Sequence, residues 1–239
     1  MYTKEDFIRK CSALGVTITD HQYAQYLKYY EMLVEKNKVM NLTAITEYDE
    51  VLDKHFIDSL SIVKAVDLNQ VTTIMDVGTG AGFPGIPLKI AFPHLKITLL
   101  DSLNKRIKFI QEVVDELGLA DVTLCHGRAE DFGHKAEYRQ QFDICTSRAV
   151  ANLTTLTEYC LPFVNKGGQF ISYKSGDVDE ELKASEKAVA VLGGKIGKVV
   201  SFNLPETDLS RTMVPVKKVG PTPGKYPRKA GTPSKEPIK

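Results

Sequence analysis

Residues 73–85 read TIMDVGTGAGFPG, a short apolar run that leads directly into a loop rich in glycine. The run at 73–77 predicts a strand, and a helical segment follows the loop. Glycines at such a point allow a tight turn and let a ligand approach the backbone closely. The stretch therefore predicts a strand, a ligand-binding loop and a helix in succession.

Short apolar runs alternate with helical segments from about residue 71 onward. The runs that we expect to form parallel strands are 73–77, 97–101, 122–125, 142–146 and 169–173. The clearest helical segments are 105–117 and 178–192. Two later runs, 196–204 and 212–219, have no helix between them and predict an antiparallel pair at the sheet edge. This pattern predicts a Rossmann-like α/β fold with a seven-stranded, mostly parallel sheet covered on both faces by helices.

Two segments flank the predicted sheet domain at 70–220. Residues 1–69 carry apolar side chains at helical spacing and predict an N-terminal helical cap. Residues 221–239 are rich in proline and glycine, which build neither a helix nor an inner strand. We expect this tail to be extended or disordered on its own, without a role in the core.

Charge is distributed unevenly along the chain. The 31 basic and 30 acidic residues give a net charge of only +1, so the whole molecule has no basic field typical of nucleic-acid binding. Residues 217–239, however, hold seven lysines and arginines against one acid. A basic tail on an acidic body indicates either a polyanionic partner or a solvated terminus.

The composition argues against several other classes. The four cysteines show no C-x-x-C spacing and the five histidines no H-x-x-x-H pair, so we expect no metal site and free thiols in a reducing compartment. The sequence has neither an N-terminal apolar signal segment nor a run of about 18 apolar residues that could span a membrane. We therefore expect a cytoplasmic protein.

The glycine loop has the spacing of one particular cofactor site. Dinucleotide sites prefer G-x-G-x-x-G, whose third glycine would fall where this chain has Phe83. The spacing found, G-x-G-x-G at Gly78, Gly80 and Gly82, instead suits S-adenosylmethionine, which has no pyrophosphate. We expect the loop backbone to lie along the methionine moiety and Asp76 to face the ammonium group. A purely structural turn is the alternative.

Polar residues follow three further strands at the same predicted edge of the sheet. Asp101 ends the second strand, where an acid either binds both ribose hydroxyls, as nicotinamide sites also do, or caps the next helix. Ala129 and Glu130 follow the third strand, where a backbone N–H and an acid could address adenine. Arg148 ends the fourth strand and either points into the ligand crevice or pairs with an acid. Together these strand ends predict an S-adenosylmethionine-dependent methyltransferase.

The whole chain resembles a known family. After the fourth strand there is neither an [Asn/Asp]-Pro-Pro-Tyr element, used for the exocyclic amine of adenine, nor a Pro-Cys element, used for covalent attack on pyrimidines. The chain instead resembles the small-subunit ribosomal RNA guanine-N7 methyltransferase G family, also called glucose-inhibited division protein B. The segments that carry the resemblance are Asn37 to Asn41-Leu42-Thr43, His55-Phe56-x-Asp58-Ser59, Asp76–Pro84, Asp101-Ser102, Lys105-Arg106, Arg128-Ala129-Glu130, Ser147-Arg148-Ala149, Gly167-Gly168 and Tyr226-Pro227-Arg228-x-x-Gly231-x-Pro233.

The resemblance implies methylation of N7 of one guanine in 16S ribosomal RNA, with the RNA or the small ribosomal subunit as partner. The implied cofactor contacts are Gly78, Phe83, Ala129, Glu130 and Arg148. Guanine N7 carries a lone pair and no proton, so we expect alignment of the reactants rather than a general base. The basic residues that are candidates for holding RNA phosphates are Lys105, Arg106, Arg148, Lys174, Lys225, Arg228 and Lys229. For each of them a solvated surface charge is the alternative.

Two other interpretations of the chain remain. A small-molecule methyltransferase would close its pocket with the N-terminal helices, but it would leave the basic tail unexplained. A non-catalytic ribosome-binding protein could keep the fold without binding S-adenosylmethionine, which a binding titration would reveal.

Overall fold

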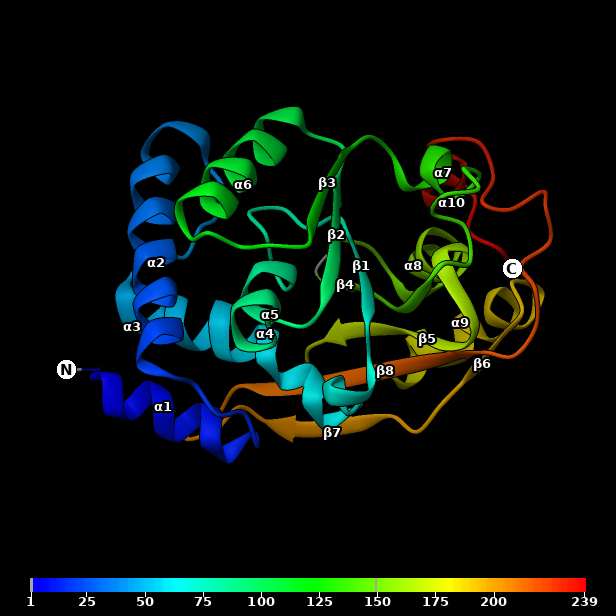
Figure 1. The fold of residues 1–239 in the computed structure, drawn as a ribbon. Coiled ribbons are helices and arrows are strands. Elements are labelled where there is room, and N and C mark those ends of the chain that lie inside the picture. The colour runs from blue at the N-terminus through cyan, green and yellow to red at the C-terminus, as the bar shows by residue number, and fades with distance from the viewer. Residues whose placement is uncertain (1, 149) are drawn as a thin grey trace.

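A mixed sheet lies at the centre of the molecule (Figure 1). The computed structural model describes residues 2–148 and 150–239. Five parallel strands lie in the order β3-β2-β1-β4-β5, and β8 pairs antiparallel with β5. Their bounds are β1 Thr73–Val77, β2 Lys96–Asp101, β3 Val122–His126, β4 Phe142–Arg148, β5 Val164–Lys174 and β8 Ser210–Lys218. The order reverses between β1 and β4, which is where ligands bind in sheets of this kind.

The far edge of the sheet differs in one respect from the prediction. The single strand expected at 196–204 is divided into β6 (Gly194–Ile196) and β7 (Val200–Asn203), and both pair with β8. The division falls at residues 197–199, and Gly197, which has no side chain to pack, begins the break. Because β6 and β7 share one position, the eight strands occupy seven positions, and the predicted seven-stranded, mostly parallel sheet is confirmed.

Helices cover both faces of the sheet, and the alternation of side chains along the strands supplies a core on each side. On β1, Ile74 belongs to the core shared with the N-terminal helices, α5 (Gly85–Ala91) and α6 (Asn104–Glu116). Its neighbour Met75 belongs to the opposite core. The helices on that second side are α7 Ala129–Phe132, α8 Leu153–Cys160, α9 Asp179–Val191 and α10 Thr232–Lys235. Short 3₁₀ turns occupy Leu68–Gln70 and Leu161–Phe163.

The N-terminal helices are part of the first core and reach the glycine loop. They comprise α1 Lys4–Ala13, α2 Asp20–Met40, α3 Tyr48–Val51, a π-helical turn Leu52–Ile57, α4 Asp58–Leu60 and a 3₁₀ turn Ser61–Lys64. Thr3 and Thr19 begin α1 and α2 with capping boxes. Tyr29 of α2 donates to the carbonyl of Ala81 across 2.6 Å. The expected cap is therefore hydrogen-bonded directly to the loop that it covers.

The expectation that residues 221–239 form an extended tail without a role in the core is wrong. The segment runs back to the side of the sheet that carries α7 and α8, and there it forms α10, which contacts α8 (Figure 1). Tyr226, Pro227 and Pro233 are buried. A proline-rich backbone does not form the hydrogen bonds of a helix or a sheet. In this segment, side chains from elsewhere in the protein donate to its backbone carbonyls instead. Arg139 donates to the carbonyls of Tyr226 and Thr222, both across 2.8 Å.

None of the helices in the described part of the chain is long and apolar enough to cross a membrane.

Candidate active site

The glycine loop takes a backbone conformation that other residues rarely adopt. Gly78 and Gly80 have φ of +71° and +65°. A β-carbon at Gly78 would lie 2.6 Å from Cγ2 of Val150, so a side chain there displaces its neighbour. The loop therefore requires glycine for its shape and for close packing, as the sequence predicted.

Asp76 holds the glycine loop in place through hydrogen bonds. Its Oδ2 accepts hydrogen bonds from Thr79 Oγ1 at 2.7 Å and from the backbone N–H of Gly85 at 3.0 Å. The side chain is fully buried, and burial raises the pKa of its carboxyl to about 6. Oδ1 has no partner among the described residues. The predicted contact of Asp76 with a cofactor ammonium group stays a prediction, and the observed role is to hold the loop.

A cavity of about 210 Å³, here called the glycine-loop cavity, opens beside this loop. It brings together four residues that the sequence predicted as neighbours from separate strands: Gly78, Asp101, Ala129 and Glu130. The remaining lining residues are Val77, Leu100, Ser102, Gly127, Arg128, Val150, Ala151, Tyr159 and Ser234. The cavity thus combines acids with an apolar floor, which suits a nucleoside.

Asp101 connects the glycine loop to the start of α6. Its Oδ2 accepts from the backbone N–H of Gly80 at 2.9 Å, and its Oδ1 accepts from that of Leu103 at 2.8 Å. Arg106 lies 3.3 Å from the same carboxylate. The residue at the N-cap of α6 is Leu103, so Asp101 is not the helix cap itself. Its position on the cavity keeps the predicted ribose contact available, and the hydrogen bonds orient the carboxylate.

Phe83 is not among the residues that line the glycine-loop cavity. Its ring stacks on His55 with 4.5 Å between ring centroids and contacts Tyr29 at 5.4 Å. The side chain is buried among aromatic residues of the N-terminal helices. Phe83 therefore joins the loop to these helices, while its implied cofactor contact stays a prediction.

A second cavity of about 420 Å³, here called the cationic cavity, lies at the ends of β4 and β5. Four cationic side chains and one acid line it together with neutral residues: Lys54, His55, Asp58, Arg148, Tyr173, Lys174, Ser175 and Arg211. The structure places both Arg148 and Lys174 here. Arg148 does not line the glycine-loop cavity, because its Nη1 donates to Asp58 at 2.7 Å. Pairing with an acid was the alternative interpretation of Arg148, and its predicted cofactor contact stays a prediction.

His55 is a residue of this cavity that the sequence reasoning did not select as a functional group. Arg148 donates from Nη2 to its Nδ1 at 3.2 Å, and its Nε2 lies 2.9 Å from Thr43 Oγ1. Because arginine only donates, Nδ1 accepts, so Nε2 carries the proton and donates to Thr43. Burial, with a smaller contribution from Arg148, lowers the pKa of His55 to about 3. His55 is therefore neutral and engaged through both ring nitrogens.

Asp58 and Arg211 were missed in the same way. Asp58 is 4% exposed and accepts from both Arg148 and Arg211, the latter across 2.5 Å. The π-helical turn before Asp58 is an irregularity that often marks functional sites. The only sequence signal was the His55-Phe56-x-Asp58-Ser59 segment in an otherwise ordinary helix.

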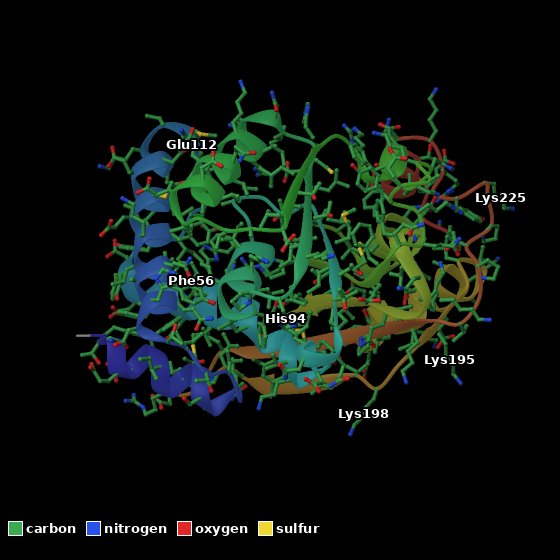
Figure 2. All side chains as sticks on the ribbon, in the orientation of Figure 1. Phe56, His94, Glu112, Lys195, Lys198 and Lys225 are labelled. Atoms are coloured by element: carbon green, nitrogen blue, oxygen red, sulfur yellow. The ribbon has the colours of Figure 1, made fainter. Side chains whose placement is uncertain are left out.

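The predicted RNA contacts outside the cavities divide into two groups. Lys225 and Lys229 are exposed, and Figure 2 shows Lys225 pointing away from the body of the molecule. Lys105 and Arg106 reach the Met40 carbonyl and Asp101 respectively. Arg228 forms an ion pair with Glu158, whose side chain is 1% exposed, while its own side chain is 27% exposed. Its predicted RNA contact stays a prediction. Ala149 of the Ser147-Arg148-Ala149 segment lies outside the described residues.

Comparisons with known proteins agree with this geometry. The model of a family described as rRNA small subunit methyltransferase G (GidB) matches residues 22–210. The chain is 52% identical over 238 residues to the ribosomal RNA small subunit methyltransferase G of Lachnoclostridium phytofermentans, covering 100% of this chain and 98% of that protein. The protein of the same name from Alkaliphilus metalliredigens is 53% identical over 229 residues, 96% of each chain.

The likeness to solved structures extends to the fold. A mutant 16S rRNA (adenine(1408)-N(1))-methyltransferase from Catenulisporales acidiphilia, solved with its cosubstrate SAM, matches with a TM-score of 0.51 at 14% identity. The match covers 64% of this chain and 87% of that one. At this identity the likeness establishes the methyltransferase fold alone.

Proposed function

The chain belongs to the ribosomal RNA small subunit methyltransferase G family, and we propose that it transfers a methyl group from S-adenosylmethionine to N7 of a guanine in 16S ribosomal RNA. The partner is then the 16S RNA or the small ribosomal subunit, and the place of action is the cytoplasm. One observation carries the proposal beyond the family: a nucleoside-sized cavity and a cationic cavity lie at the ends of adjacent strands.

Residues that end or follow neighbouring strands line the two cavities where the strand order reverses. Gly78, which follows β1, lines the glycine-loop cavity, and Arg148, which ends β4, lines the cationic cavity. Strands β1 and β4 are direct neighbours in the sheet. A methyl donor on one side and a nucleotide on the other would therefore meet at the switch point of the sheet.

The residues at hand fit the adenosine end of S-adenosylmethionine. Asp101 and Glu130 offer carboxylates, and Val77 and Leu100 offer an apolar surface for the adenine. Gly78 lines the same cavity without a side chain, which suits close approach of the adjoining part of the cofactor to the backbone. When bound, S-adenosylmethionine supplies an electrophilic methyl group on a sulfonium centre.

The reaction needs no proton transfer from the protein. The lone pair of guanine N7 forms the new N–CH₃ bond while the S–CH₃ bond breaks and its electron pair stays on sulfur. The positive charge moves from sulfur to the guanine ring. His55, whose two nitrogens are both engaged, fits a site that aligns reactants rather than one that removes a proton.

The cationic cavity suits an RNA nucleotide held by its phosphates. Lys54, Lys174 and Arg211 line the opening, where each is also paired with an acid (Glu50, Glu181 and Asp58), and Tyr173 contributes an aromatic side chain. In A-form RNA the deep and narrow major groove hides guanine N7, so the target guanine must lie in a loop or leave the stack. A cavity is needed for such a base, whereas a flat basic surface would suffice for a duplex.

The experiment compares 16S RNA and small subunits from cells with and without the gene. Purified protein and methyl-labelled S-adenosylmethionine are added to the unmodified material, and the product is mapped by mass spectrometry of nuclease digests. We expect one additional N7-methylguanine per RNA. Label in another base, or binding of S-adenosylmethionine without methylation of either RNA substrate, would overturn the proposal.

A further inference from the structure

The C-terminal segment 226–236 lies against the glycine-loop cavity. Ser234 of α10 lines this cavity together with Asp101, Glu130 and Tyr159. Figure 1 shows α10 beside α7, far from the end of the sheet at which β8 leads into this segment. The chain therefore returns from the antiparallel edge to the cavity formed by the parallel strands.

The segment also holds one of the cavity's acids directly. The backbone N–H of Gly231, the N-cap of α10, donates to Oε1 of Glu130 across 2.8 Å. Glu130 is 4% exposed and belongs to α7, a helix of only four residues. So short a helix fixes its side chains weakly on its own. The hydrogen bond from Gly231 therefore orients the Glu130 carboxylate.

A buried ion pair fastens the segment to the body of the protein. Arg228 donates from Nη2 to Glu158 Oε2 at 2.7 Å and from Nε to Oε1 at 2.9 Å, and its backbone N–H donates to the same Oε1 at 2.8 Å. Glu158 lies on α8 with its side chain 1% exposed. A bidentate arginine and carboxylate pair fixes both distance and direction. His134 adds a contact of 2.7 Å to the Pro227 carbonyl.

We propose that residues 226–236 form a wall of the S-adenosylmethionine cavity, and that Arg228 is a positioning residue that holds Gly231 against Glu130. The inference rests on the proposed function only in taking S-adenosylmethionine as the ligand of this cavity. Loss of Arg228 leaves the Glu158 carboxylate buried without a partner and releases the segment from α8. Glu130 then loses its fixed orientation, and the cofactor binds more weakly.

Arg228→Ala tests the anchor, with Lys198→Ala as its control. Both variants lose one positive charge, but Lys198 lies between β6 and β7, is exposed, and its side chain contacts no described residue through a hydrogen bond or ion pair. Titration calorimetry with S-adenosylmethionine, below the melting temperature of each variant, should show affinity reduced by about tenfold or more for Arg228→Ala and unchanged for Lys198→Ala. With RNA saturating, KM for S-adenosylmethionine should rise while kcat changes little.

Ser234→Tyr tests the wall while the Arg228–Glu158 ion pair stays in place, and it removes only the exposed hydrogen bond from Ser234 Oγ to the Gly231 carbonyl. Ser234 is exposed at the mouth of the cavity, so a larger side chain there costs the fold little and narrows the space for the ligand. Its control is Lys235→Tyr, because Lys235, the next residue of α10, is also exposed and does not line the cavity. We expect Ser234→Tyr to bind S-adenosylmethionine about tenfold or more weakly at an unchanged melting temperature.

The outcomes separate the two proposals. A wild-type protein that does not bind S-adenosylmethionine overturns the proposed function. If the wild type binds, unchanged affinity in Ser234→Tyr, or in folded Arg228→Ala, overturns the inference. Should Arg228→Ala not fold, the Ser234→Tyr result decides alone.

Discussion

Arg148 at the end of β4 donates from Nη2 to Nδ1 of His55 across 3.2 Å, and this hydrogen bond joins the sheet to the N-terminal helices. The histidine must accept, so it stays neutral, and its ring is stacked on Phe83 of the glycine loop. One pair of residues thus connects the cationic cavity, the cap and the cofactor loop. Protonation of His55 would place two cations in contact and break this connection.

The first prediction concerns pH. Because burial and Arg148 lower the pKa of His55 to about 3 from 6.5, the unfolded chain takes up this proton before the folded one does. The stability from neutral His55 is therefore fully present above pH 6.5 and is lost as the pH falls toward 3. His55→Gln removes the titration but keeps an acceptor and a donor. Urea unfolding is measured for both proteins between pH 8 and pH 4. As the pH decreases, the free energy of unfolding of the wild type should fall more steeply than that of His55→Gln, by at most about 1.4 kcal/mol per pH unit. If the free energies of unfolding of the two proteins change with pH in parallel, His55 does not titrate in this way.

Gly78→Ala should weaken S-adenosylmethionine binding by about tenfold or more. The added methyl group would lie 2.6 Å from Cγ2 of Val150, so it shifts a residue that also lines the glycine-loop cavity. The left-handed backbone adds strain of about 1–2 kcal/mol. Gly118→Ala is the matched control, because Gly118 has φ of +62° with open space around it and follows α6 away from the cavity. Calorimetry beside melting curves should show comparable strain in both variants but weaker binding only in Gly78→Ala. Equal affinities would remove the loop from the cofactor site.

Asp101→Ala should lower both stability and cofactor affinity. Its carboxylate accepts from the N–H groups of Gly80 and Leu103, which lose their partner, and the proposed ribose contact is lost as well. The cost to binding should be about 1.5–3 kcal/mol, as for hydrogen bonds to charged groups. The control is Asp143→Ala, since Asp143 accepts from the N–H groups of Thr72 and Thr73 at the opposite edge of the sheet. That variant should lose stability while S-adenosylmethionine affinity, measured by calorimetry, is retained. If Asp101→Ala also retains it, Asp101 is structural only.

Sequence reasoning succeeded where the pattern is local. The strands were predictable because apolar runs end in polar residues or glycine, and the neighbours Gly78, Asp101, Ala129 and Glu130 followed because the carboxyl ends of parallel strands meet at one edge. No further rule was needed to bring these residues together, since strand order and direction fix their positions.

The same reasoning could not find contacts set by tertiary packing. Asp58 meets Arg211, which lies 153 residues away in the chain, and no spacing rule connects them. The C-terminal segment was misread because proline and glycine exclude regular elements but do not exclude packing. Its carbonyls are satisfied by the side chain of Arg139, and its position is fixed by Glu158, both far from it in sequence.

The last prediction concerns the lysines of this segment. Arg228 is engaged internally, but Lys225, Lys229 and Lys235 are exposed, and we predict that they neutralise RNA phosphates. Replacing all three by glutamine should lower RNA affinity, and the slope of log affinity against log salt should become shallower by about 2–3, given about 0.7–0.9 per phosphate contact. Stability and S-adenosylmethionine affinity should not change, because the replaced side chains are solvent-exposed and the backbone contacts remain.

The control replaces Lys28, Lys38 and Lys108, which lie on α2 and α6 at the opposite end of the molecule (Figure 1). It removes the same charge, so it accounts for any effect of net charge alone. Filter binding to 16S RNA or to small subunits at several salt concentrations gives both slopes. If the two triple variants change the slope equally, the lysines of the C-terminal segment act only through net charge. A larger change for Lys225, Lys229 and Lys235 would place RNA phosphates along residues 225–235, which overlap the segment 226–236 that, by our inference, forms a wall of the cofactor cavity.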